Sequence, residues 1–280
     1  MRRIDKKLIV SDFDGTLLTG NQIIPDSVRS AINEYVACGG IFAVCTGRML
    51  RSILPRVREL GLKGLVVAYQ GTVIAEIESG KIIKKGAIEY SSASEVCAYI
   101  EEQRGFEKLA YGINAYSEEI LYTDIPKDNE HLKLYERITG VEAESAGIDM
   151  SEFISKNKLC CQKIACLVPP ELRESLYLNL LGKFGSKFDV TCSAQVLVEV
   201  SPLNDNKGEA LKFIASHYGV SMDSTVAVGD NLNDLPMIKQ AGVGVAVGNA
   251  VQELKDAADI VTVSNNDGAV AKIIEKYGFR

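Results

Sequence analysis

Histidine is scarce in this sequence, and no two cysteines have the C-x-x-C spacing that is typical of zinc sites. The 280 residues include two histidines and seven cysteines. Because zinc in proteins is held mainly by thiolates and imidazoles, this composition argues against a zinc centre. The odd number of cysteines, most of them within apolar runs, favours buried thiols in a reducing compartment over disulfides.

A basic patch and a membrane-spanning apolar run are also missing. Lys and Arg number 31 against 37 Asp and Glu, which gives a formal net charge of −6. This balance argues against a nucleic-acid partner, whose phosphates are bound by clustered cations. No apolar run approaches the ~20 residues that cross a bilayer, and no apolar signal segment follows the charged N-terminal residues. We therefore expect a cytoplasmic protein without a membrane partner.

Two carboxylates, Asp12 and Asp14, directly follow an apolar run near the start of the chain. Far downstream, a second strand-like run is followed by Asp230 and Asp234. Like charges held close together raise one another's pKa unless a cation or a proton neutralises them. Four acidic residues at strand ends therefore indicate a divalent-cation site, and oxygen ligands with few nitrogens favour Mg²⁺.

The two ends of the chain show the same alternation of strands and helices. Continuous apolar runs, as expected for strands covered on both faces, occur at residues 8–10, 41–45, 65–68 and 225–228. Segments with helical spacing lie between them. This alternation predicts an α/β fold with parallel strands and right-handed crossovers, that is, a doubly wound, Rossmann-like core.

Residues 85–194 follow a different pattern, with frequent turn residues and less regular order. The candidate helices and strands there are 94–103, 120–123, 164–168 and 171–184. We interpret this region as an inserted α+β domain, so that residues 1–84 and 195–280 together form one core. The composition, 46% apolar and 24% charged, suits such a globular protein.

Two further polar positions fall where ligands bind in open α/β sheets, beyond the carboxyl ends of the strands. Thr46 and Gly47 follow the run 41–45. Taken alone they form an ordinary helix cap as readily as an anion-binding turn. Lys207 precedes a helix, where the dipole disfavours a cation. A solvated lysine is the commoner explanation, but a bound phosphate would also account for it.

Taken together, these features resemble the haloacid dehalogenase-like (HAD) phosphatases, specifically their Cof-type branch with a class IIB cap. The motifs that carry the resemblance are DxDGTLL at 12–18, Thr46 at a strand end, NKG at 206–208, GDxxND at 229–234 and GNA at 248–250. The resemblance implies a catalytic HAD core at 1–84 and 195–280. It also implies that 85–194 is the cap that determines substrate specificity.

The resemblance implies a Mg²⁺-dependent phosphatase that works through an aspartyl-phosphate intermediate. Asp12 would be the nucleophile, and Asp14 would protonate the leaving oxygen and later activate water. Mg²⁺ would be bound by the Asp12 carboxylate, the Asp14 backbone carbonyl and Asp230. Asp234 would contribute to the metal site directly or through water.

Phosphate binding is implied for a second set of residues. Thr46 and Lys207 would also be catalytic, because they would stabilise the phosphoryl group during transfer. The full set of expected phosphate-binding residues is Gly15, Thr46, Gly47, Lys207 and Asn233.

One segment departs from the family pattern. Members often carry Asn-Gly-Ala after the third core strand, close to the site and the cap hinge. Here that segment begins with Tyr69 and Gln70, so position 70 keeps an amide but on a longer side chain. Any substrate contact inferred at this position is therefore open.

The expected partner is a small phosphorylated metabolite, in the first place a sugar phosphate, and the expected state is a monomer or weak homo-oligomer. The alternatives are a phosphorylated cofactor or precursor, such as pyridoxal phosphate or a flavin precursor, and a phosphotransferase or phosphomutase. A signalling receiver domain is much shorter and lacks an acid two residues after its phosphorylated aspartate. A catalytically silent binding module is disfavoured, because buried like charges are costly to keep without use.

Overall fold

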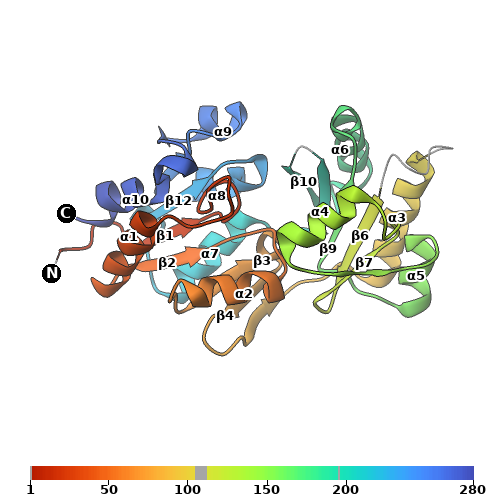
Figure 1. The fold of residues 1–280 in the computed structure, drawn as a ribbon, viewed down its shortest axis with the longest axis horizontal. Helices are drawn as coiled ribbons and strands as arrows, with labels where there is room; N and C mark the ends of the chain where they lie inside the picture. The colour runs from red at the N-terminus through yellow and green to blue at the C-terminus, as the bar shows by residue number, and fades with distance from the viewer. Residues whose placement is uncertain (1, 105–111, 195) are drawn as a thin grey trace. The chain divides into compact units, whose positions relative to one another are not determined.

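The structure is a computed structural model that describes residues 2–104, 112–194 and 196–280 (Figure 1). The chain forms two compact units. The first comprises the N-terminal residues up to Gly47 together with Ile53–Lys84 and Asn206–Arg280, and the second comprises Arg48–Ser52 and Lys85–Asp205. Within the described residues, no helix is both long and apolar enough to cross a membrane.

A five-stranded parallel sheet forms the centre of the first unit. The strand order is β14-β13-β12-β1-β2. The bounds are Leu8–Ser11 (β1), Ile41–Val44 (β2), Thr225–Gly229 (β12), Val243–Ala246 (β13) and Ile260–Val261 (β14). β1 pairs with both β2 and β12, in a register that places Ser11 beside Val44 and Val228. The predicted fold class, an α/β core built on a parallel sheet, is confirmed.

Amphipathic helices accompany this sheet. Their bounds are Asp26–Ala37 (α1), Leu50–Glu59 (α2), Lys207–His217 (α7), Leu235–Gln240 (α8), Gln252–Ala257 (α9) and Ala269–Ile273 (α10). In α1, Val28, Ile32 and Tyr35 recur at helical spacing and are buried. Gly39, with φ of 93°, follows shortly after the end of the helix, as is typical of a helix stop.

A separate three-stranded sheet, in the order β3-β4-β5, follows α2. Its strands are Leu65–Ala68 (β3), Val73–Glu76 (β4) and Ile82–Lys85 (β5). A parallel bridge between Cys45 and Val67 links β3 to the end of β2. β4 then pairs with β3 in the antiparallel sense. The run 65–68 is thus a strand as predicted, whereas its antiparallel partners were not predicted.

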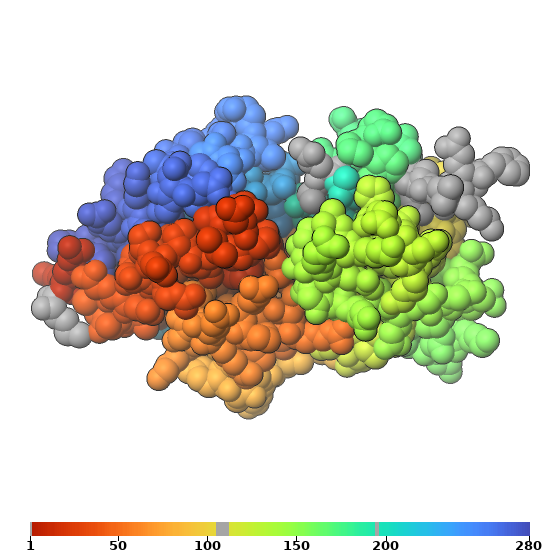
Figure 2. All heavy atoms as spheres, viewed as in Figure 1, coloured from red at the N-terminus to blue at the C-terminus, as the bar shows by residue number. Residues whose placement is uncertain are grey.

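The two ends of the chain meet in the first unit. Ile4 forms an antiparallel bridge with Phe279, and the backbone N–H of Asp5 donates to Gly278 O at 3.1 Å. Figure 2 shows the N-terminal residues in red and the C-terminal residues in blue packed against one another. The unit is therefore assembled from segments that lie far apart in the sequence.

The second unit is built on a six-stranded sheet in the order β10-β11-β9-β6-β7-β8. The strand bounds are Gly112–Ser117 (β6), Ile120–Thr123 (β7), Ala143–Ser145 (β8), Lys163–Leu167 (β9), Phe188–Ala194 (β10) and Leu197–Pro202 (β11). The helices are Tyr90–Gln103 (α3), Glu130–Thr139 (α4), Met150–Asn157 (α5) and Pro170–Phe184 (α6). The pairs β10–β11, β11–β9, β9–β6 and β6–β7 are antiparallel, whereas β7 pairs with β8 in the parallel sense. The unit has the α+β character expected for the insertion.

Alternate residues of this sheet form the core of the second unit. Ile113, Ile164 and Val198 belong to one buried cluster with side chains of α3, α5 and α6. Because β11 pairs with β9 and β10, the unit continues to Asp205, beyond the expected end of the insertion at 194. Its role as a specificity cap stays a prediction.

Candidate active site

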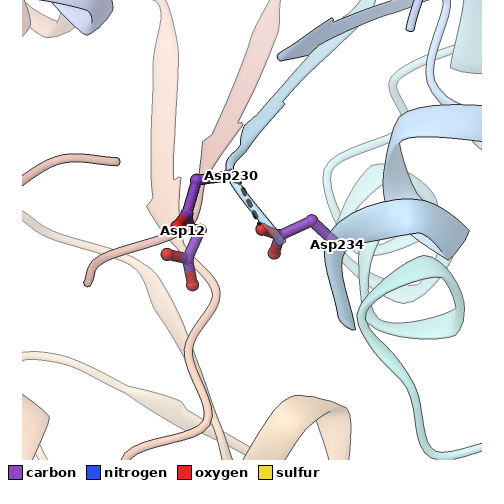
Figure 3. Close-up of side chains that lie close together, drawn as sticks. All are labelled: Asp12, Asp230 and Asp234. Atoms are coloured by element: carbon purple, nitrogen blue, oxygen red, sulfur yellow. Dashed lines mark hydrogen bonds between the residues drawn. The ribbon is translucent and has the colours of Figure 1, made fainter. Parts of the chain in front are cut away.

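The carboxyl ends of β1 and β12 bring three predicted site residues together. Because Ser11 lies beside Val228, the chain leaves both strands at the same edge of the sheet. Asp12 keeps a bond to the partner strand, since its backbone N–H donates to Val228 O at 2.9 Å. Figure 3 shows the carboxylates of Asp12, Asp230 and Asp234 near one another, and ligand oxygens of all three lie within 4.8 Å of each other.

The loop after β12 is folded around the side chain of Asp234. Its Oδ2 atom accepts from the backbone N–H groups of Asp230 at 2.8 Å and Asn231 at 3.0 Å. The carboxylate thus stabilises the start of a short turn of helix. Gly229 is required beside it, because a Cβ there would lie 2.4 Å from Asp234 Cβ.

Lys207 is the cation of this cluster, and its side chain is fully buried. The Nζ atom donates to Asp12 Oδ1 and, at 2.6 Å, to Asp234 Oδ1. Lys207 is the first residue of α7, and the preceding Asn206 caps that helix through bonds from Gly208 N and Glu209 N, both at 3.1 Å. The cap fixes where the lysine enters the site.

The charges in the cluster do not balance. Burial raises the pKa of Asp12 well above its ordinary value, and the neighbouring Asp234 and Asp230 raise it further, against the lowering effect of Lys207. Burial, together with Asp234, raises the pKa of Asp230 to about 7. Burial lowers the pKa of Lys207, but Asp12 and Asp234 outweigh that effect and raise it. One buried ammonium thus faces several carboxylates.

This donor set fits a hard divalent cation. All the donors are carboxylate oxygens, which Mg²⁺ prefers. A second cation would offset the burial and the repulsion that together raise the pKa values of Asp12 and Asp230. Both oxygens of Asp234 are already engaged by Lys207 and backbone N–H groups. Asp12 and Asp230 are therefore better placed than Asp234 to hold a metal directly.

The turn that follows Asp12 is shaped by Asp230. Gly15 has φ of 77°, and a Cβ on it would lie 2.5 Å from Asp230 Oδ2, so only glycine fits. The Thr16 hydroxyl donates to Asp230 Oδ1 at 3.1 Å. Asp14 lies in the same turn and is half-buried. The sequence motif includes Thr16, but no role for it was predicted.

Two asparagines from the C-terminal segment support this turn. Asn249 Nδ2 donates to Gly15 O at 2.8 Å, and Asn249 Oδ1 accepts from the backbone N–H of Asn265 at 2.9 Å. Asn265 Nδ2 in turn donates to Leu18 O at 2.7 Å. The GNA motif pointed to Asn249, whereas nothing in the sequence pointed to Asn265.

Thr46 and Gly47 lie at the end of β2. The Thr46 N–H donates to Val67 O at 3.0 Å, and its side chain is buried. The N–H of the adjacent Cys45 donates to Ser11 O at 2.9 Å, which places the end of β2 beside the residue that precedes Asp12. Burial raises the pKa of the Cys45 thiol.

The remaining predicted residue, Asn233, forms no hydrogen bond with these carboxylates in the described part of the chain. Its Nδ2 atom donates to Gln70 Oε1 at 3.0 Å. The structure thus joins Asp12, Asp230, Asp234 and Lys207 in one cluster and places Asp14 and Gly15 in the turn beside it. The phosphate-binding roles stay predictions.

Known proteins resemble this chain over almost its whole length. A profile of the haloacid dehalogenase-like hydrolases matches residues 9–274. A candidate phosphatase of Streptococcus pyogenes serotype M6 is 30% identical over 278 residues, which cover 97% of this chain and 98% of that protein. The 5-amino-6-(5-phospho-D-ribitylamino)uracil phosphatase of Bacillus subtilis is 28% identical over 274 residues, which cover 98% of this chain and 96% of that protein. A solved structure from Thermotoga maritima is 31% identical, with a TM-score of 0.77 over 100% of this chain and 99% of its own.

The family profile covers both units as well as the acidic cluster. It includes the segment that carries Asp12 and the loop that carries Asp230 and Asp234. The chain therefore belongs to the haloacid dehalogenase-like hydrolases and, as its motifs predict, is a phosphatase of their Cof-type branch.

Proposed function

We propose that this enzyme is a Mg²⁺-dependent phosphatase of a small phosphorylated metabolite, most readily a sugar phosphate, and that it works through an aspartyl-phosphate. The observation that carries the proposal is the buried Asp12 at the end of β1. Lys207 binds it, and the Asp230 and Asp234 carboxylates lie close by. One edge of the sheet thus carries a nucleophile, a fixed cation and oxygen donors for a second cation.

Asp12 is the proposed nucleophile and Asp14 the proposed acid and base. As a carboxylate oxygen of Asp12 bonds to phosphorus, the bond from phosphorus to the leaving oxygen breaks, and that oxygen takes a proton from Asp14. Asp14 then takes a proton from water, whose oxygen attacks phosphorus and releases Asp12 and inorganic phosphate. Such acid–base work contributes ~10²–10⁴-fold to the rate.

The phosphoryl group is proposed to lie against Lys207, the Thr46 hydroxyl and the turns at Gly15 and Gly47, with Asn233 at the edge. Phosphoryl transfer depends mainly on positioning and charge stabilisation. Lys207 is suited to that task, because Asp12 and Asp234 hold its Nζ in place. It does not need to be ordered when the substrate arrives.

The proposed ligands of Mg²⁺ are the carboxylates of Asp12 and Asp230 and the backbone carbonyl of Asp14, with Asp234 contributing directly or through water. When bound, the metal would supply positive charge to the phosphoryl oxygens. The raised pKa values of Asp12 and Asp230 support this, since they result from burial and from neighbouring carboxylates, and a bound cation would offset both effects.

The second unit, Lys85–Asp205, is proposed to select the leaving group and to exclude bulk water. The name of the B. subtilis relative describes a substrate with a phosphorylated ribityl chain. That relative supports a polyhydroxylated substrate, and it specifically favours a phosphorylated flavin precursor as the second candidate.

Inorganic phosphate release from a panel of phosphorylated metabolites, with Mg²⁺ and with a chelator, tests the proposal. We expect Mg²⁺-dependent release concentrated on a few polyhydroxylated compounds. Asp12→Asn should keep the fold and lower release by at least ~10³-fold, whereas Asp223→Asn, at an exposed position outside the site, should change little.

Near-normal turnover by Asp12→Asn would refute the nucleophile. No release from any compound, including a simple aryl phosphate, would refute the phosphatase. Transfer of the phosphoryl group to a sugar acceptor in preference to water would instead indicate a phosphotransferase or phosphomutase.

A further inference from the structure

The turn after β3 has an unusual backbone and lies against the proposed phosphate site. Tyr69, Gln70 and Gly71 have φ values of 50°, 61° and 123°. Two successive non-glycine residues in the left-handed region are strained, and such strain persists where the surroundings hold it and clusters at functional sites. Tyr69 and Gln70 are also buried.

This turn contacts segments that carry three of the expected phosphate-binding residues. The Gln70 N–H donates to Thr46 O at 2.9 Å, and a Cβ on Gly47 would lie 2.4 Å from Gln70 Nε2. On its other side, a Cβ on Gly71 would lie 2.5 Å from the carbonyl oxygen of Asn206, the cap of α7. Position 70 therefore lies between the end of β2 and the helix that begins with Lys207.

The side chain of Gln70 holds the third segment. Asn233 Nδ2 donates to Gln70 Oε1 at 3.0 Å, across 163 residues of sequence. The other end of the Asn233 amide, Oδ1, is buried and has no hydrogen-bond partner among the described residues. Buried polar atoms are nearly always bonded, so an unpartnered end calls for a ligand or a rearrangement.

Phosphate oxygens accept hydrogen bonds, so phosphate requires the Nδ2 end of Asn233. If the side-chain amides of Gln70 and Asn233 each rotated by half a turn, Gln70 Nε2 would donate to Asn233 Oδ1. Asn233 Nδ2 would then point away from Gln70 and be available to the phosphate. Only a residue with both a donor and an acceptor at this reach can hold Asn233 in either orientation. We infer that Gln70 is a positioning residue, which forms a hydrogen bond with one end of the Asn233 amide and thereby directs the other end to the bound phosphate. This inference rests on the proposed function.

A double-mutant cycle between positions 70 and 233 tests the inference. Gln70→Asn is the main variant, because asparagine tolerates positive φ and keeps an amide but is one methylene shorter. Gln70→Met keeps the length without the amide. Each is combined with Asn233→Ala, and inorganic phosphate is the probe. The readouts are its inhibition constant against an aryl phosphate and the thermal shift it produces with Mg²⁺.

Gln70→Asn and Gln70→Met should each weaken phosphate binding by about tenfold, the effect of one charge-assisted hydrogen bond. Without phosphate, their melting temperatures should fall by only a few degrees, because each variant loses one buried hydrogen bond. In the Asn233→Ala background, a change at position 70 should cause little further loss of phosphate affinity. The inference would be overturned if the losses of phosphate-binding free energy in the single variants added fully in the double variants, or if Gln70→Asn bound phosphate as tightly as wild type. If wild type itself neither binds nor releases phosphate, the proposed function fails instead.

Discussion

The backbone N–H of Asp230 donates to Oδ2 of Asp234 at 2.8 Å, the contact drawn as a dashed line in Figure 3. The other oxygen of Asp234 accepts from Lys207 Nζ at 2.6 Å. One carboxylate thus shapes the loop that carries its neighbour and also fixes the lysine. Asp230 itself has a pKa raised to about 7, mainly by burial and by Asp234. In the metal-free protein, Asp234 therefore stabilises the fold, whereas ionised Asp230 destabilises it.

Opposite effects on stability follow for two isosteric variants. Asp234→Asn should lower the unfolding free energy of the metal-free protein by about 2–3 kcal/mol, because it removes a charged partner from a buried lysine. Asp230→Asn should raise it, because it removes a charge that burial and Asp234 disfavour. Denaturant unfolding at pH 8 in a chelator measures both. Changes of the same sign would contradict the distinction between the two acids.

The metal-free protein should lose stability as the pH rises through about 7. The pKa of Asp230 is 3.8 in its ordinary state and about 7 in the folded protein, so between these values the folded state binds a proton that the unfolded state lacks. That contribution is fully present below the lower pKa and is lost above the higher one. Melting temperatures in a chelator from pH 5 to pH 8 should decrease, and Asp230→Asn should flatten the profile.

Binding of Mg²⁺ should show the complementary pH dependence. The metal competes with the proton on Asp230, so its apparent affinity should fall roughly tenfold per unit below pH 7. The raised pKa of Asp12 acts in the same direction. Calorimetric titration of Mg²⁺ at pH 6 and pH 8 gives the measurement. Equal affinity at the two pH values would show that Asp230 is not a ligand.

The sheet of the first unit could be predicted because each of its longer strands is a continuous apolar run. β1, β2 and β12 are covered on both faces, and such strands stand out in the sequence. β5 could not be found in this way, since none of its residues is buried. The helix α4 was missed although its signals are present, with Asn129 as the N-cap and Gly140 as the C-cap.

The acidic cluster was predictable for a different reason. Its residues lie in short motifs directly after strands. Because the carboxyl ends of parallel strands lie at the same edge of the sheet, these motifs are expected to meet there. The contacts of Gln70 with Asn233 and of Asn265 with Leu18 span 163 and 247 residues. Such contacts depend on how loops from distant parts of the chain pack together, and no local sequence pattern predicts them.

Gly15→Ala should disable the metal site through a collision with Asp230. The new Cβ would lie 2.5 Å from Asp230 Oδ2, at a φ of 77° that alanine adopts with strain. Gly147→Ala is the matched control, since its φ is 71° but nothing lies within 4 Å of its Cβ. Both should lose ~1–2 kcal/mol from the backbone alone, but only Gly15→Ala should lose the thermal shift produced by Mg²⁺. An equal loss of that shift in both would refute the steric explanation.

Removing one partner of a buried ion pair should strongly destabilise the second unit. Lys163 Nζ lies 2.5 Å from Glu199 Oε1, and each side chain is only 3% exposed. Lys163→Met removes the ammonium that offsets the buried Glu199 charge and should cost about 3–5 kcal/mol. Lys85→Met, which breaks an exposed pair with Glu118, should change stability by ~1 kcal/mol or less.

Adding Glu199→Leu to Lys163→Met should restore most of the lost stability, because the penalty of Lys163→Met comes from keeping the Glu199 charge buried rather than from the missing attraction. Denaturant unfolding of the two single variants and the double variant measures this. If the double variant were as unstable as Lys163→Met, the pair would be needed for its bonds, and the desolvation argument would fail. Lys163 Nζ also lies over the Tyr116 ring, 4.6 Å from its centroid. Because the double variant loses this cation–π contact, its unfolding free energy should stay about 1–2 kcal/mol below that of wild type.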